Sequence, residues 1–430
     1  MAVVIAGVPK RSARALDLLN FFMADVQTGF GPFVAVYLTT HKWTQVEIGL
    51  ALTLGTVTSV AAQIPAGAIV DAMANKRLAA GAAIVSVMIA AVGLAVAPFT
   101  LPVLAAEVLH GFGSSVLVPA IAAISLQMVG HAGLGERLGR NASFASAGSG
   151  MAAGIMGGIG TALGGASVFW LTAGMGVPAL AALWWISPGR YEAPMPAARG
   201  VDWRGLRLLF SDRRLLIFGA CVALFHLSNA AMLPLAASQV TERTAEYANL
   251  IIAACIVVPQ AVVTVMSPWI GRYSNYWGRK PLMLLGWGAL PARGLLLAFL
   301  PGPWLLIAGQ SVSGISAAVF GVMLPLIAAD LTRERGHFNL CLGALGLCIF
   351  SGAAISTTAA GWIADNAGHH AAFLALAIAG LAGTMLIGLA MPETRAVAKR
   401  MRPGQPFKPA AAVIDLLPSR TRDGFPPVRK

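Results

Sequence analysis

Twelve apolar stretches of about 20 residues each dominate this 430-residue sequence and limit what it can fold into. A helix of about 20 apolar residues is long enough to cross the hydrocarbon layer of a membrane. Only 11% of the residues are charged, compared with about 25% in soluble domains, which excludes an ordinary soluble enzyme. We therefore expect an all-α membrane protein with twelve transmembrane helices. The stretches cover residues 16–39, 46–70, 77–97, 102–128, 142–164, 166–186, 214–239, 247–270, 281–300, 303–329, 338–363 and 370–391.

The basic residues predict the orientation of these helices. If the N-terminus lies inside the cell, the outer loops carry Lys42 and Arg243, Arg293 lies within a stretch, and the other 27 of the 30 Lys and Arg fall on the inner side. This distribution follows the positive-inside rule and predicts that both termini are cytoplasmic in a bacterial inner membrane. The net charge of +13 then reflects topology and contact with the lipid bilayer, so no nucleic-acid partner is expected.

A short pattern occurs twice, and its two copies lie 204 positions apart. The first runs from Gly67 to Arg77 (GAIVDAMANKR) and the second from Gly271 to Lys280 (GRYSNYWGRK). Each closes an apolar stretch with a glycine, a short polar residue four places later, and a basic pair. A period of almost half the chain indicates an internal duplication, as found in many transporters.

This pattern resembles the loop motif Gly-x-x-x-Asp-Arg-x-Gly-Arg-Arg/Lys of the major facilitator superfamily. The first copy keeps Gly67, Asp71 and Lys76 but has Ala72, Ala74 and Asn75 at the Arg, Gly and Arg positions, and the second keeps Gly271, Gly278, Arg279 and Lys280 but has Asn275 for Asp. The resemblance implies two six-helix bundles, 1–188 and 214–395, around a central cavity. A cytoplasmic linker, 189–213, would join them, and a disordered basic tail, 396–430, would follow.

We expect the two motif copies to form a gate. Asp71 and Asn275 would pair with nearby basic residues or cap a helix N-terminus of the other half, and the glycines would let helices approach closely. The predicted gate residues are Gly67, Asp71, Lys76, Arg77, Gly271, Asn275, Gly278, Arg279 and Lys280.

Polar residues inside the apolar stretches are candidates for the proton and substrate pathway, because a buried charge in lipid is costly. Asp25 lies near the middle of the first stretch and is the first candidate to carry a proton, the alternative being a structural hydrogen-bonding role. Glu107 and His110 share one helix face, and Arg293 would either anchor an anion or, as we favour, pair with a buried acid. The full predicted set is Asp25, Gln27, Gln63, Glu107, His110, His226, Asn229, Gln260, Arg293 and Gln310.

The favoured function is proton-coupled efflux of a small amphipathic or cationic compound by a monomeric transporter. Proton-coupled uptake of a metabolite or iron chelate, with Arg293 binding an acidic group, is one alternative, and a non-transporting membrane sensor is another. Many exporters of the family carry Arg-x-x-Gln-Gly in the fourth span, where this sequence has Glu107-Val-Leu-His110-Gly111, so that arginine's coupling role does not transfer. No metal, cofactor or enzymatic motif is present in the sequence.

Overall fold

The computed structural model describes residues 9–28, 30, 32–187, 211–236, 248–299, 303–333 and 337–395. Within these ranges the chain is helical and contains no strand. Residues 1–395 form one compact unit. The predicted tail, 396–430, and the predicted linker as far as residue 210 lie outside the described residues. The helices are α1 (Lys10–Thr28), α2 (Pro32–Thr40), α3 (Gln45–Ala72), α4 (Lys76–Val96), α5 (Thr100–Leu163), α6 (Ala166–Trp185), α8 (Arg213–Asn229), α10 (Ala248–Trp277), α11 (Lys280–Phe299), α12 (Pro303–Thr332) and α13 (Phe338–Ala390).

Eight apolar segments among the described residues are long enough to cross a membrane. Two of them, α5 and α13, are far longer than one bilayer. Each contains a glycine with non-helical backbone, Gly130 (φ 62) in α5 and Gly368 (φ 84) in α13, at which two shorter helices meet. The amide of Asn141 donates to the Ser125 hydroxyl at 2.7 Å, although 16 residues of straight helix would separate them by about 24 Å. The two parts of α5 therefore fold back on each other at Gly130.

The same argument applies to α13. Gly352 packs against Ala223 of α8, and Gly383 packs against the neighbouring Leu224. A straight helix would place these two glycines about 46 Å apart, so α13 also reverses direction, at Gly368.

Three predicted boundaries differ from the structure. The stretch 16–39 is divided, because α1 ends at Thr28 and α2 begins at Pro32, a residue that fits the first turn of a helix but not its interior. The predicted loops 129–141 and 364–369 are helical apart from the reversals at Gly130 and Gly368. The polar residues of the first loop indicated exposed chain, but several of them are hydrogen-bonded within the protein.

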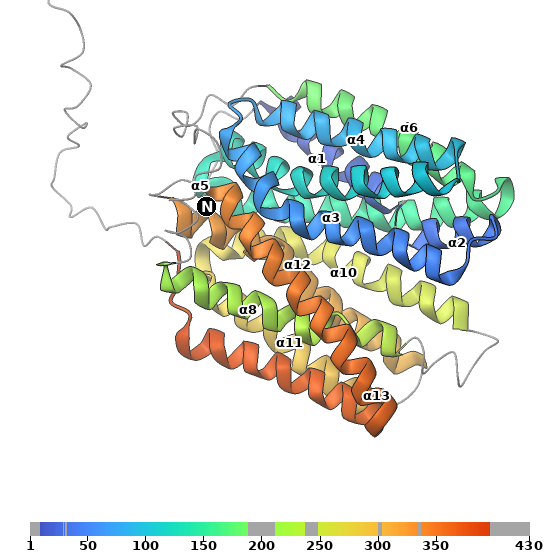
Figure 1. Cartoon of the computed structure of the whole chain (residues 1–430). Coiled ribbons are helices and arrows are strands. Elements are labelled where there is room, and N and C mark those ends of the chain that lie inside the picture. Colours follow the sequence, from blue (N-terminus) through green and yellow to red (C-terminus); the bar gives the residue numbers. More distant parts are fainter. Residues whose placement is uncertain are drawn as a thin grey trace, which may run out of the picture. The chain divides into compact units, whose positions relative to one another are not determined.

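The helices form two groups, α1 to α6 and α8 to α13 (Figure 1). One apolar core consists entirely of residues between Ala15 and Ile186. A second is built mainly from residues between Leu215 and Met391, with contributions from α3 and α5. Leu19, Ile84 and Leu117 in the first core and Trp287 in the second are fully buried.

The groups meet along two seams, of which the first joins α3 to the beginning of α13. Gly67 lies so close to α13 that a Cβ there would overlap the carbonyl oxygen of Asn339, and a Cβ on Gly343 would overlap that of Gln63. Gly361 is on the same face of α13 five turns later, and no heavy atom of the described residues lies within 4 Å of its Cβ position. As far as the described residues reach, the seam is closed near the motif and open at the other end.

The second seam, between the later part of α5 and α10, shows the same gradient. A Cβ on Gly139 would overlap the carbonyl oxygen of Ser267, whereas one on Gly150 would lie 3.7 Å from the Cβ of Gln260. Both seams are therefore sealed at the end that carries the repeated motif.

Candidate functional site

Asp71 caps the first turn of α13 from the end of α3. Its carboxylate accepts hydrogen bonds from the backbone N–H of Asn339 (3.2 Å), the Asn339 side-chain amide (2.7 Å) and the backbone N–H of Leu340 (2.9 Å). The first N–H groups of a helix have no partner within the helix, and the helix dipole favours a negative charge there. Of the two predicted roles of Asp71, the structure shows helix capping across the seam, and no ion pair of Asp71 occurs among the described residues.

Asn275 occupies the corresponding position of the second copy and makes weaker contacts. Its amide nitrogen donates to the carbonyl of Ala132 across the second seam at 3.4 Å, and its oxygen accepts from Arg279 at 3.5 Å. A neutral amide with long hydrogen bonds holds a seam less strongly than a carboxylate with three donors. The two seams are therefore secured unequally.

The basic pairs of the two copies cap helix C-termini in matching ways. Lys76 donates to the carbonyl of Asp71 (3.0 Å) at the end of α3, and Arg279 donates to that of Ser274 (2.7 Å) near the end of α10. Arg77 donates to the carbonyl of Ile186 at the end of α6, and Lys280 to that of Gly388 (2.9 Å) in the last turn of α13. Cations at these positions satisfy free carbonyl groups and complement the helix dipole.

Two acids that the sequence analysis missed complete the second copy. Asp330 of α12 pairs with Arg279 at 2.8 Å. Glu393, just after α13, accepts from the backbone N–H groups of Arg279 (2.9 Å) and Lys280 (3.0 Å) and so caps the start of α11. Burial opposes ionisation of Glu393, but these N–H groups and that of Arg395 outweigh it and lower its pKa. Glu393 could have been noticed in the sequence as an acid just after the last apolar stretch. Its partner Arg279, however, lies 114 positions away.

The first group of helices holds a second ion-pair network that the sequence analysis also missed. Asp17 of α1 bonds to Arg137 and Arg140 of α5, and the side chains of Asp17 and Arg137 are almost completely buried. Arg137 also donates to Asn141 at 2.8 Å. The two arginines are three residues apart on one helix face, which could have indicated a shared acidic partner.

Glu107 and His110 belong to α5, where Glu107 is buried and His110 is half-buried. The Glu107 carboxyl group packs against Gly55 of α3, and the His110 ring stacks on Phe30 with centroids 3.7 Å apart. Neither Glu107 Oε1 nor His110 Nε2 has a hydrogen-bond partner among the described residues. Asp25 and Gln27 belong to α1, but their side chains lie outside the described part of the structure.

Gln63 lies at the first seam, where its amide reaches the Ser115 hydroxyl at 3.5 Å and its side chain packs against Gly346. Gln260 faces the second seam near Gly150. His226 of α8 contacts the rings of Phe225 and Phe320 and has no described partner for Nε2.

Arg293 is buried inside the second group of helices. It donates to Asn229 of α8 (2.8 Å) and to Gln310 of α12 (3.2 Å), so three predicted site residues meet here. The favoured pairing of Arg293 with a buried acid is not found, since no carboxylate among the described residues forms an ion pair with it. Arg293 Nε and Gln310 Nε2 are buried without described partners. The group is therefore a cationic donor site held by neutral amides.

The described residues contain no cluster of His, Cys, Asp and Glu that could hold a metal ion. The arrangement can do two things: hold and release two helix groups at one end, and offer buried groups to a proton or an anionic group.

Comparisons with known proteins agree on one family. The model of the Major Facilitator Superfamily matches residues 16–290 and 221–423. An uncharacterized MFS-type transporter of Mycobacterium tuberculosis is 39% identical over 92% of this chain and 96% of its own length. The class B tetracycline resistance protein of Escherichia coli is 30% identical over 30% of this chain and 32% of its own length.

Solved structures share the fold at low sequence identity. The human organic anion transporter has a TM-score of 0.71 and 15% identity, covering 88% of this chain and 99% of that one. The fucose:proton symporter of Escherichia coli also has a TM-score of 0.71 and 15% identity, covering 87% and 97%.

Proposed function

The chain belongs to the Major Facilitator Superfamily and is a membrane transporter of that family, and on this premise we propose that it exports a small amphipathic or cationic compound in exchange for protons. The observation that carries the proposal is the uneven packing of the two seams, closed at the motif and open at the other end. Helix groups that touch at one end alone can rock about a central site and expose it to each side in turn. We assign the described conformation to the outward-facing state.

The arrangement of the helices supports the proposal of twelve spans in two bundles. The first span comprises α1 and α2, the two parts of α5 and of α13 make two spans each, and α3, α4, α6, α8, α10, α11 and α12 make one each. The basic residues Lys76, Arg77, Arg137, Arg279 and Lys280 gather at the motif end, which we place on the cytoplasmic side together with both termini.

Proton coupling is assigned to Asp25 and to Glu107 with His110. Glu107 Oε1 is buried without a described partner, and an unpaired charge there would be costly, so the group can hold a proton in one state and release it when water enters. Export is supported by the partial similarity to proteins named for tetracycline resistance.

The decisive experiment measures flux of two probes, tetracycline and ethidium, in proteoliposomes under an imposed pH gradient. Exchange predicts that the probe moves against the proton flow, and this sign holds for either orientation of the inserted protein. Glu107→Gln and Asp25→Asn should abolish gradient-driven accumulation while leaving probe exchange at equal pH. Probe movement in the same direction as protons would overturn export by exchange. Full gradient-driven flux in Asp25→Asn would make Asp25 structural.

Uptake of an acidic compound is the second candidate, and the buried Arg293 site favours it. Arg293 has two amide partners, a free Nε and no described acid, which suits a carboxylate or another anionic group. Labelled mono- and dicarboxylates in the same proteoliposomes would then move with protons, and Arg293→Gln would remove that flux. Arg272→Gln, an exposed arginine on α10, is the matched control and should retain it.

A further inference from the structure

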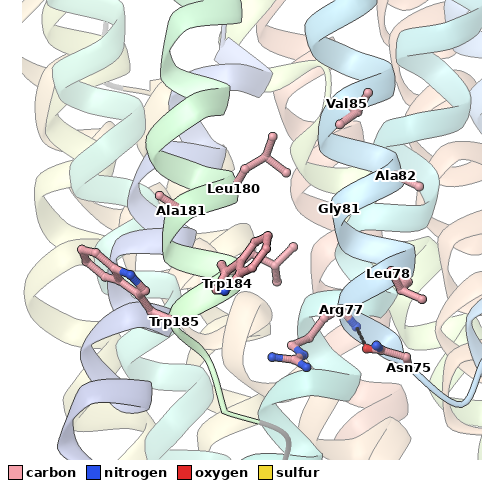
Figure 2. Close-up of a pocket in the computed structure, with 11 residues that line it drawn as sticks. Asn75, Arg77, Leu78, Gly81, Ala82, Val85, Leu180, Ala181, Trp184 and Trp185 are labelled. Carbon is pink, nitrogen blue, oxygen red and sulfur yellow. Dashed lines mark hydrogen bonds between the residues drawn. The ribbon is translucent and has the colours of Figure 1, made fainter.

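A groove on the outer surface of the first group of helices has no place in the transport cycle described above. It lies between α4 and α6 and has a volume of about 1110 Å³ (Figure 2). Leu78, Gly81 and Val85 line one wall, and Leu180 and Trp184 line the other. Gly81 forms part of the floor, where the Leu183 side chain of α6 comes within 3.5 Å of its Cβ position.

The walls of the groove suit a hydrocarbon chain. Trp184 is 85% exposed and Leu78 62% exposed, on two helices whose composition fits a membrane span. Side chains of this kind on the outer face of a spanning helix contact lipid acyl chains. From Asn75 to Val85 the groove follows α4 for about 15 Å, which is half the thickness of the hydrocarbon layer and therefore the depth of one leaflet.

One end of the groove is cationic. Arg77 lies there, at the start of α4 (Figure 2). One of its guanidinium nitrogens donates to the carbonyl of Ile186 and so caps α6. A guanidinium group has five N–H donors, and no other side-chain hydrogen bond of Arg77 occurs among the described residues. Arg11 of α1 lies over the ring of Trp185 at 5.7 Å, close to the same end. Both cations stand where the helices begin or end, at the depth of the headgroups.

We propose that this groove binds one anionic phospholipid, with an acyl chain between α4 and α6 and its phosphate at Arg77 and Arg11. Tryptophan at the membrane interface and arginine at a phosphate are the side chains expected for such a ligand. A phosphate at Arg77 would add a bridge between α4 and α6 beside the turn that places Asp71. Binding of this lipid does not depend on which substrate is transported or in which direction.

Fluorescence quenching by brominated lipids tests the proposal on the full chain in vesicles. The Trp184 signal is the difference between the wild type and Trp184→Phe. At equal mole fraction, phosphatidylglycerol with brominated chains should quench this signal more strongly than brominated phosphatidylcholine. Each of Arg77→Gln and Arg11→Gln should reduce the preference for the anionic lipid about fivefold, because one basic residue near the surface contributes about 1 kcal/mol.

Arg213→Gln is the matched control, since Arg213 is an exposed arginine at the start of α8 in the other group of helices. It should leave the quenching of Trp184 unchanged. Arg11→Gln keeps the test valid if Arg77→Gln fails to fold. Equal quenching by both lipids in the wild type would overturn the proposal, and so would loss of preference in Arg213→Gln. Protection of Trp184 from both lipids, together with cross-linking of Trp184→Cys into dimers, would assign the groove to a second copy of this chain instead.

Discussion

Asp71 and Leu340 are 269 positions apart in the sequence, yet the carboxylate of Asp71 accepts a hydrogen bond from the backbone N–H of Leu340 at 2.9 Å. This contact crosses the seam between α3 and α13 at the closed end of the molecule. Its counterpart in the second copy is the neutral Asn275, which reaches Ala132 at 3.4 Å. Asp71 therefore holds its seam with stronger contacts than Asn275 holds the other.

Replacing Asp71 by Asn should favour the conformation that is open at the motif end. Loss of a charged cap that accepts three hydrogen bonds costs about 1 to 2 kcal/mol, which shifts the equilibrium about tenfold. Spin labels at Ala74→Cys and Arg333→Cys, in a chain lacking the native cysteines, would report a longer distance by electron resonance. Asn275→Ala is the matched control and should shift the distance distribution much less, and an equal effect of both variants would contradict the unequal seams.

Gly67→Ala should prevent full closure of the first seam, because the added methyl group would overlap the carbonyl of Asn339. Neither group is the end of a flexible side chain, so the helices must separate. We expect probe transport to fall at least tenfold while the protein still inserts and folds. Gly361→Ala adds the same methyl group at the far end of the same seam, where no described heavy atom lies within 4 Å of the Cβ position, and should transport normally. Normal transport by Gly67→Ala would show that the seam tolerates separation.

Asp17→Asn should destabilise the first group of helices, since it leaves the guanidinium of Arg137 buried without its acid. Removing one partner of a buried ion pair costs about 3 to 5 kcal/mol. Thermal unfolding in detergent should show a clear loss of stability, partly recovered when Arg137 is also replaced by Leu. If Asp17→Asn were as stable as the wild type, the ion pair would not contribute to the stability of the fold.

Local features of the sequence predicted that the chain is helical and where its two motif copies lie. The apolar stretches and the Gly67 to Arg77 pattern are local, and so is the charge at Asp71. The break between Thr28 and Pro32 was missed because apolar composition continues through it. The sequence did not reveal which distant residues bond to each other. Asp17 and Arg137 are 120 positions apart, and Glu393 and Arg279 are 114 positions apart. No periodicity within one helix encodes such pairs.

The same limit explains the outcome at Arg293. Its burial followed from its place inside an apolar stretch, and the cost of an isolated charge suggested an acidic partner. The described residues instead provide the amides of Asn229 and Gln310. Amide oxygens accept hydrogen bonds from a guanidinium group without neutralising its charge. Sequence composition does not show whether a buried arginine is paired with an acid or with amides.

Glu393 gives the stability of the motif end a pH dependence whose sign follows from its contacts. Its carboxylate accepts from the N–H groups at the start of α11, and although burial opposes this, the hydrogen bonds lower its pKa below the unfolded value. A group of this kind stabilises the fold above the unfolded pKa of about 4.3, and the contribution disappears as the pH falls through the lower, folded pKa.

Glu393→Gln should therefore lower the melting temperature at pH 7, by an amount matching about 0.5 to 1 kcal/mol because the side chain is largely exposed. The difference from the wild type should vanish in the acid range below pH 4. Asp365→Asn, at an exposed acid of α13, is the matched control and should leave the melting temperature unchanged. A constant difference for Glu393→Gln at every pH would mean that packing, not charge, holds α11 to the end of α13.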